Sequence, residues 1–217
     1  MPRLPVGAFR RYDETPDEEF YETPRLVTHI EDGAIAAVTQ LYRELFPAGG
    51  EILDLMSSWV SHLPEEVRYR RVAGLGMNEV ELKSNPRLDE YVVQNLNRNA
   101  ELSFADAEFD AVGICVSIDY LTNPIAVLRE AGRVLKAGSP VAITFSNRCF
   151  PTKAVAIWRQ LNDKGHMCLV EHYLKEAGNF RNIRSLDRSP GRLFSDPLYA
   201  VIGESTGQYT NEETEGA

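Results

Sequence analysis

The stretch EILDLMSSW at residues 51–59 decides the fold. Its apolar start predicts a short buried strand that ends beside Asp54, and its polar end predicts a tight loop. A buried strand followed by such a loop is typical of a doubly wound α/β sheet, in which the loop presents backbone amides to a nucleotide-like ligand. Glycine normally occupies such a loop because it turns sharply and lets the backbone approach the ligand. Here Met56, Ser57 and Ser58 occupy it, so we expect a nucleotide-type pocket with a changed loop.

Strand-like and helix-like segments alternate on both sides of this stretch. Strands are expected at about 51–55, 68–75, 91–94, 109–117, 140–145, 182–186 and 198–203, and helices at about 32–45, 79–83, 124–135, 152–161 and 166–177. Asp32 is the expected N-cap of the first helix. The alternation predicts a mostly parallel sheet that helices cover on both faces, and the last two strands are expected to form an antiparallel pair.

The composition limits the classes of function. A net charge of −9 and a pI near 5.0 argue against a broad phosphate-binding surface, so no nucleic-acid partner is expected. Three widely spaced cysteines form no disulfide framework, which is typical of a reducing compartment such as the cytoplasm or an organellar stroma. No segment is apolar and long enough to predict a membrane span.

We divide the chain into three parts. Residues 1–31 are predicted to form an acidic N-terminal arm, either loose or laid over the body as a strap. Residues 32–205 are predicted to form one α/β domain, because no linker or repeat interrupts them. Residues 206–217 are expected to be a disordered polar tail.

Several strings in the middle of the chain are specific to one family. LSF (102–104) and FDAV (109–112) are followed by LRE (128–130) and RVLKAGS (133–139). With the order of elements, these strings resemble the class I S-adenosylmethionine-dependent methyltransferases, particularly the small type 11 group, over roughly residues 35–204. The resemblance implies a Rossmann-like sheet of seven strands, mostly parallel with the last strand antiparallel, and helices on both faces.

The first cofactor segment of this family is only partly matched. Asp54 stands at the acidic position that ends the first strand. Met56, Ser58 and Val60 stand where the family has the glycines of a Gly-x-Gly-x-Gly loop. These side chains adopt positive φ at a higher cost than glycine does. The resemblance therefore implies S-adenosylmethionine as cofactor, with a remodelled loop around it.

Two further cofactor positions also differ. Gly76 stands where the family has the carboxylate that accepts both ribose hydroxyls, and Asn95 stands where an acidic residue contacts the adenine. Loss of the ribose carboxylate lowers affinity roughly tenfold to a hundredfold or more, unless Asn78 or Glu79 compensates. Carried over position by position, the resemblance assigns cofactor contacts to the following residues: Tyr21, Arg25, Asp54, Met56, Ser57, Ser58, Gly76, Met77, Asn95, Leu96 and Ser117.

The sequence says less about catalytic residues than about the cofactor positions. Methyl transfer from a sulfonium relies mainly on proximity and alignment, so a base is needed only for a poorly nucleophilic acceptor. Asp119 and His29 are the candidate bases. Cys168 and His172 are four residues apart on one expected helix, but no second pair accompanies them, so no metal site is expected.

Three functions remain open at this point. The resemblance implies a methyltransferase that acts on a small molecule with S-adenosylmethionine. The missing glycines and ribose carboxylate favour a catalytically inactive binding or interaction module with the same fold. A pocket for a different nucleotide or metabolite is the third alternative. The sequence does not determine turnover, the methyl acceptor or the oligomeric state.

Overall fold

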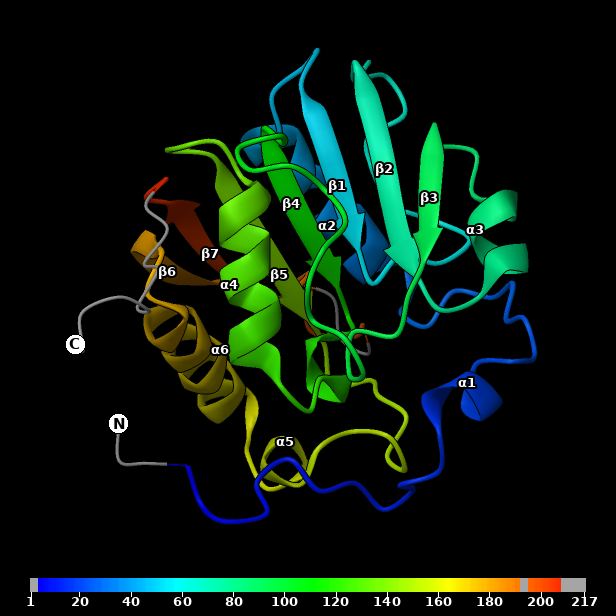
Figure 1. The fold of residues 1–217 in the computed structure, drawn as a ribbon, viewed down its shortest axis with the longest axis vertical. Coiled ribbons are helices and arrows are strands. Elements are labelled where there is room, and N and C mark those ends of the chain that lie inside the picture. The colour runs from blue at the N-terminus through cyan, green and yellow to red at the C-terminus, as the bar shows by residue number, and fades with distance from the viewer. Residues whose placement is uncertain (1–3, 192–194, 208–217) are drawn as a thin grey trace, which may run out of the picture.

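The computed structural model describes residues 4–191 and 195–207. At its centre lies a seven-stranded sheet in the order β3-β2-β1-β4-β5-β7-β6 (Figure 1). The strands are β1 (Glu51–Leu55), β2 (Arg71–Gly76), β3 (Glu90–Val93), β4 (Ala111–Cys115), β5 (Pro140–Phe145), β6 (Phe180–Asp187) and β7 (Tyr199–Ser205). Strands β1 to β5 pair in parallel, whereas β7 is antiparallel to both β5 and β6. The predicted fold class is therefore confirmed.

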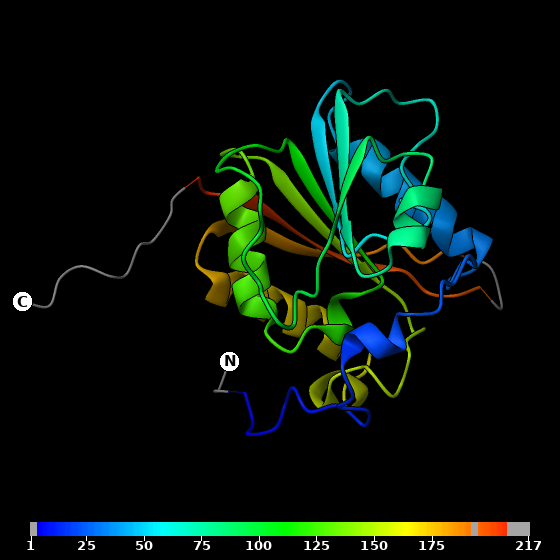
Figure 2. The same cartoon turned by 45° about the vertical axis from the view of Figure 1, so that its right-hand side comes forward.

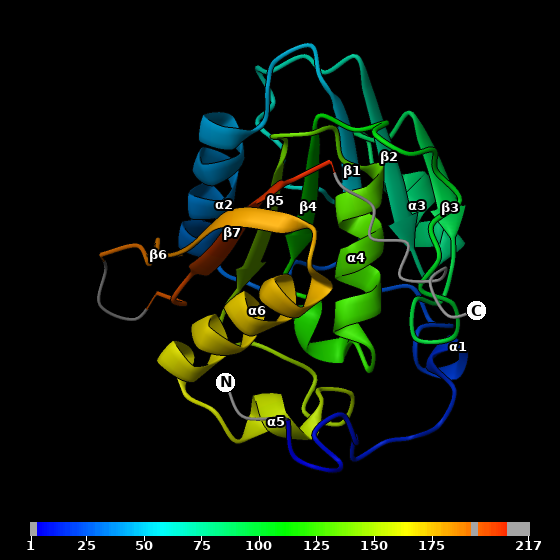
Figure 3. The same ribbon diagram turned by 60° about the vertical axis from the view of Figure 1, so that its left-hand side comes forward.

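Helices cover both faces of the sheet (Figures 2 and 3). They are α1 (Asp17–Phe20), α2 (Asp32–Leu45), α3 (Glu79–Ser84), α4 (Pro124–Val134), α5 (Ala156–Arg159) and α6 (Asp163–Ala177), with a 3-10 helix η1 (Ile118–Tyr120). Because side chains alternate along a strand, Leu53 packs into the core under α4 and α6, and its neighbour Ile52 packs into the core under α2. Asn123 caps α4 by accepting a hydrogen bond from the Ala126 N–H.

Two helix predictions need correction. Asp32 is the first residue of α2 rather than its cap, and the preceding Glu31 makes no side-chain capping bond. The helix expected at 152–161 is reduced to the four residues of α5. The reason is that the Ala156 and Ile157 N–H groups donate to the carbonyls of Arg10 and Ala8, at 2.7 and 2.9 Å, instead of to carbonyls of their own helix.

The described N-terminal residues 4–31 first run past α5 and the loop before it, where Ala8, Arg10 and Asp13 form backbone hydrogen bonds, and then pass α3 (Figure 1). We call this segment the strap. Its strongest tie is Lys153, which is fully buried and donates to the Thr15 carbonyl at 2.7 Å. The same ammonium lies 3.2 Å from Asp13 and 3.4 Å from Asp17. The domain boundary at residue 31 stays a prediction, and the tail beyond residue 207 lies outside the described residues.

A search of the described helices for a stretch long and apolar enough to cross a membrane finds none.

Candidate cofactor site

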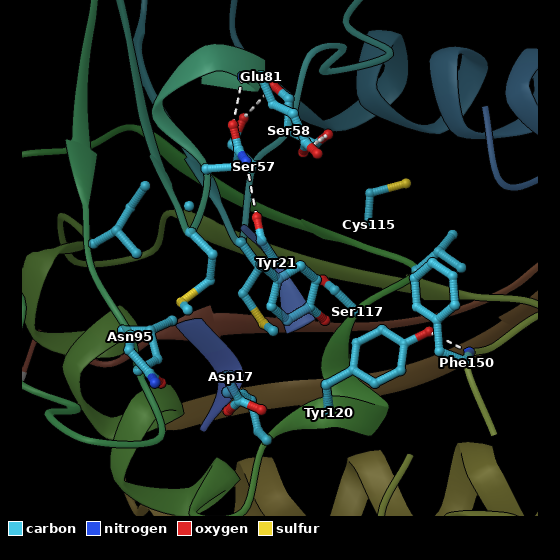
Figure 4. A pocket seen from close by; sticks show the side chains of 18 of the residues that line it. Asp17, Tyr21, Ser57, Ser58, Glu81, Asn95, Cys115, Ser117, Tyr120 and Phe150 are labelled. Carbon is cyan, nitrogen blue, oxygen red and sulfur yellow. Dashed lines mark hydrogen bonds between the residues drawn. The ribbon is translucent and has the colours of Figure 1, made fainter. Parts of the chain in front are cut away.

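A cavity of about 280 Å³ lies at the carboxyl ends of β1, β2, β3 and β4, and strap residues complete its wall (Figure 4). β1 and β4 are neighbours in the sheet. The strand that follows β1 in sequence lies on one side of this pair, and the strand that follows β4 lies on the other side. Such a switch point is where open α/β sheets bind ligands. The cavity brings together the following predicted residues: Tyr21, Arg25, His29, Met56, Ser57, Ser58, Gly76, Met77, Asn95, Leu96 and Ser117.

The loop after β1 is folded onto the end of β2. Met56 adopts a left-handed backbone with φ of 62°, the conformation that favours glycine. The Ser57 N–H donates to the Leu75 carbonyl at 2.7 Å, which draws the loop across the last residue of β2. A Cβ on Gly76 would overlap the Ser57 carbonyl oxygen. Residue 76 must therefore be glycine in this loop conformation, and the changed loop and the missing carboxylate are one coupled change.

Asp54 supports this loop from behind the cavity wall. Its Oδ2 accepts the hydroxyls of Ser57 at 2.5 Å and Ser61 at 2.6 Å, and Asn85 donates to the Ser61 hydroxyl at 2.8 Å. Burial raises the pKa of Asp54 to about 6, although the two serine hydrogen bonds oppose the shift. The carboxylate does not line the cavity, so its contribution is to hold the loop, and a direct cofactor contact stays a prediction.

Glu81 joins the loop, the strap and α3, and sequence reasoning missed it. Its Oε2 accepts the Ser58 hydroxyl at 2.7 Å, and its Oε1 accepts the Arg25 N–H at 2.7 Å (Figure 4). Asn78 caps α3 and also donates to the carbonyls of Tyr21 and Glu22, at 2.8 and 3.1 Å. A glutamate in the first turn of a short helix looks like an ordinary solvated charge, so the sequence gives no signal that this one is buried.

Strap side chains form an aromatic part of the wall. The Arg25 guanidinium stacks over the rings of Phe20 and Phe150, with its carbon 4.5 and 5.4 Å from the ring centroids. Burial raises the pKa of the Tyr21 hydroxyl, with the nearby Asp119 adding to the shift, so this phenol stays protonated at physiological pH. The His29 ring lies against Phe150, and burial lowers the pKa of His29.

At the end of β3, the cavity wall contains two side-chain amides that already form hydrogen bonds within the protein. The side-chain amide of Asn95 donates to Glu18 at 3.0 Å. Its side-chain oxygen accepts a hydrogen bond from the backbone N–H of Asn97 at 2.9 Å. Asn97, which sequence reasoning also missed, donates to Asp17 and to the Tyr120 carbonyl, both at 2.9 Å. The predicted adenine contact of Asn95 therefore relies on lone pairs that these bonds leave free.

The hydroxyl of Ser117 lies just beyond the end of β4. The Ser117 hydroxyl is buried, faces the cavity and has no hydrogen-bond partner among the described residues. A buried polar group of this kind is expected to meet a water or a ligand. Asp119, two residues later, is buried outside the cavity wall, and burial raises its pKa to about 8. Asp119 is therefore mostly protonated at neutral pH, and it becomes available as a base only near or above pH 8.

Among the described residues, no group of three or more His, Cys, Asp and Glu side chains is arranged to hold a metal ion.

The comparisons with known proteins concern the domain and its fold. The model of the family described as "Methyltransferase domain" matches residues 58–143, and so begins just beyond Asp54, Met56 and Ser57. No curated protein matches the chain.

Similar solved structures cover most of the chain at low sequence identity. A putative methyltransferase of Haloferax volcanii, solved with the Trm112 methyltransferase activator, has a TM-score of 0.61 at 12% identity, over 89% of this chain and 94% of its own. The [4+2]-cyclase SpnF has a TM-score of 0.60 at 14% identity, over 87% and 91%. A SAM-dependent methyltransferase from Archaeoglobus fulgidus has 0.57 at 16%, over 80% and 95%. The chain has the fold of the class I S-adenosylmethionine-dependent methyltransferases, and its middle segment matches their methyltransferase domain.

Proposed function

We propose that the protein binds S-adenosylmethionine in the cavity and transfers the cofactor's methyl group to a small molecule. The observation that carries this proposal is the cavity at the β1/β4 switch point, which gathers the loop after β1, the ends of β2 and β3, and the strap. The three free cysteines favour a reducing compartment, such as the cytoplasm or an organellar stroma.

The reaction asks little of the protein beyond alignment. A lone pair of the acceptor attacks the methyl carbon, the carbon–sulfur bond breaks, and its electron pair stays on sulfur, so that S-adenosylhomocysteine is released. Holding acceptor and methyl group in line supplies most of the acceleration. Tyr120 and Phe150 line the end of the cavity nearest β4 and β5, where we place the acceptor. The rings of these two residues are largely apolar, which favours a small acceptor with a hydrophobic body.

A second candidate, a binding module without turnover, rests on one specific observation. The Ser57 carbonyl occupies the space beside Gly76, so no carboxylate can stand at the end of β2. The fold alone does not decide between the candidates, because one fold hosts different reactions and one similar structure is described as a cyclase.

The two candidates are separated by a methyl-transfer experiment. The purified protein is incubated with CD3-labelled S-adenosylmethionine and a small-molecule extract, and labelled products are sought by mass spectrometry. We expect a labelled product that depends on the protein. Binding of the cofactor without any labelled product would favour the binding module. A different nucleotide or metabolite, carried through purification and seen by native mass spectrometry, would contradict the choice of cofactor.

A further inference from the structure

Two carboxylates line the cavity, and their surroundings differ. Glu81 lies where α3 and the loop after β1 meet, and Asp17 lies at the opposite end, in α1 of the strap (Figure 4). Both side chains are buried, at 8% and 5% exposure respectively. A buried carboxylate needs compensation from cations or hydrogen bonds. The cations and hydrogen bonds around each carboxylate therefore show whether it can still accept hydrogen bonds from a ligand.

Asp17 is fully compensated by the protein. Arg11 pairs with its Oδ1 at 2.5 Å, and Lys153 lies 3.4 Å from the same oxygen. Asn97 donates to its Oδ2 at 2.9 Å. Two cations and an amide therefore surround this carboxylate, and its role is to fasten the strap.

Glu81 is compensated only in part. Each of its oxygens accepts one neutral hydrogen bond, from Ser58 and from the Arg25 backbone N–H, and no cation of the described residues forms an ion pair with it. A carboxylate has about four lone-pair sites, so each oxygen of Glu81 can accept one more hydrogen bond. Two neighbouring acceptors of this kind match a ligand that presents two adjacent hydroxyl groups.

The loop conformation makes Glu81 the available acceptor at this end of the cavity. A carboxylate at position 76 is excluded, because even a Cβ there would overlap the Ser57 carbonyl. The amide of Asn78 is occupied by the α3 cap and the strap. The same loop places the Ser58 hydroxyl on Glu81, so the change that removes one carboxylate also orients another.

We propose that Glu81 accepts the two hydroxyls of a vicinal diol, which in a nucleoside cofactor is the ribose 2′,3′-diol, and that Ser58 orients the Glu81 carboxylate. Acidic side chains serve nucleoside ribose groups in this way in other α/β folds. The assignment deepens the proposed function and rests on it for the identity of the nucleoside. Glu81 is then a binding residue, and Ser58 acts through it as a positioning residue.

The test uses ligands with and without the diol. Calorimetric titrations with S-adenosylhomocysteine, adenosine and 2′,3′-dideoxyadenosine are run on the wild-type protein and on Glu81→Gln. Gln keeps the shape and one acceptor oxygen, so the links to Ser58 and Arg25 can persist. Glu79→Gln is the matched control. The sequence offered Glu79 as a possible ribose acceptor, but its side chain is exposed, is paired with Lys83 and does not line the cavity.

If the proposal holds, Glu81→Gln weakens the binding of both diol ligands about tenfold to a hundredfold, and Glu79→Gln leaves it unchanged. Dideoxyadenosine binds the wild-type protein more weakly than adenosine does, and Glu81→Gln weakens it no further. A residue that merely supports the fold would weaken all three ligands alike. Ser58→Ala, which keeps the carboxylate, is expected to reduce the preference for the diol in part.

The outcomes separate this inference from the proposed function. Binding of S-adenosylhomocysteine that Glu81→Gln leaves unchanged would overturn the role of Glu81 and leave the proposed function standing. Diol-dependent binding of adenosine that Glu81→Gln removes, without binding of S-adenosylhomocysteine, would support Glu81 and overturn the proposed cofactor. No binding of any probe to the wild-type protein would overturn both.

Discussion

The buried carboxyl of Asp54 makes the stability of the protein depend on pH in a direction that is unusual for an aspartate. Its pKa rises from 3.8 to about 6 in the folded state, chiefly because burial disfavours the charged form. Between these two values the folded state holds a proton that the unfolded state has lost. Stability from this group is therefore fully present below about pH 4, falls as the pH rises to about 6, and stays reduced above that.

The size of the effect follows from the shift. At about 1.4 kcal/mol per pKa unit, the charged form of Asp54 costs the folded state about 3 kcal/mol at pH 8. Asp54→Asn removes the charge and keeps an oxygen that can accept from Ser57 or Ser61. We expect the free energy of unfolding of Asp54→Asn, relative to wild type, to rise by about 3 kcal/mol between pH 3 and pH 8.

Urea denaturation of both proteins at a series of pH values measures this difference, and effects common to both cancel. Asp110→Asn is a control of opposite sign. Burial opposes the shift at Asp110, but hydrogen bonds from the Glu51 N–H and Lys136 lower its pKa overall, so its charged form stabilises the fold. Asp110→Asn should lose stability relative to wild type as the pH rises through the acid range up to about pH 4, and its difference from wild type should then stay constant up to pH 8. A difference between Asp54→Asn and wild type that does not change with pH would refute the reasoning.

Substitutions at three other buried positions test the fastening of the strap, the loop after β1 and the burial of Asp119. Lys153→Met leaves Asp17 without its buried ammonium partner. It should lower the free energy of unfolding by about 3–5 kcal/mol and speed proteolysis within residues 4–31. Unchanged cleavage would show that other contacts hold the strap. Gly76→Asp restores the family's carboxylate. It should lower stability by about 1–3 kcal/mol and weaken S-adenosylhomocysteine binding, because the side chain displaces the Ser57 carbonyl. Tighter binding would contradict the coupling between the loop conformation and the missing carboxylate. Asp119→Asn should raise the melting temperature more at pH 9 than at pH 6, because burial raises the pKa of Asp119 to about 8 and its charged form is the costly one; equal gains at both pH values would count against that burial.

The strands and most helices could be predicted because their signals are local. β1 and β5 match their predicted ranges, since each is an apolar run bounded by turn residues. The helix at 152–161 failed for a non-local reason. Its first N–H groups bond to the strap, and Lys153 is drawn into a cluster with Asp13 and Asp17, residues more than a hundred positions earlier.

The sequence predicted the site residues that lie at the ends of strands. It missed the roles that depend on where a side chain points. Gly76 ends a strand, and Met56, Asn95 and Ser117 follow strands that end at the same edge of the sheet, so their order along the chain places them together. The roles of Asp54 and Glu81 depend on where the Ser57 and Ser58 hydroxyls point. No pattern of residue types encodes that geometry.

The claim that the cavity is a cofactor site is tested most directly by calorimetric titration of the purified protein with S-adenosylhomocysteine, beside a Ser117→Leu variant. Leucine at 117 fills the cavity and breaks no hydrogen bond within the described residues, because the Ser117 hydroxyl has no partner there. We expect binding in the micromolar range to the wild-type protein and much weaker binding to the variant. Absence of binding to the folded wild-type protein at millimolar concentration, or equal binding to both proteins, would contradict the assignment of the cavity as a cofactor site.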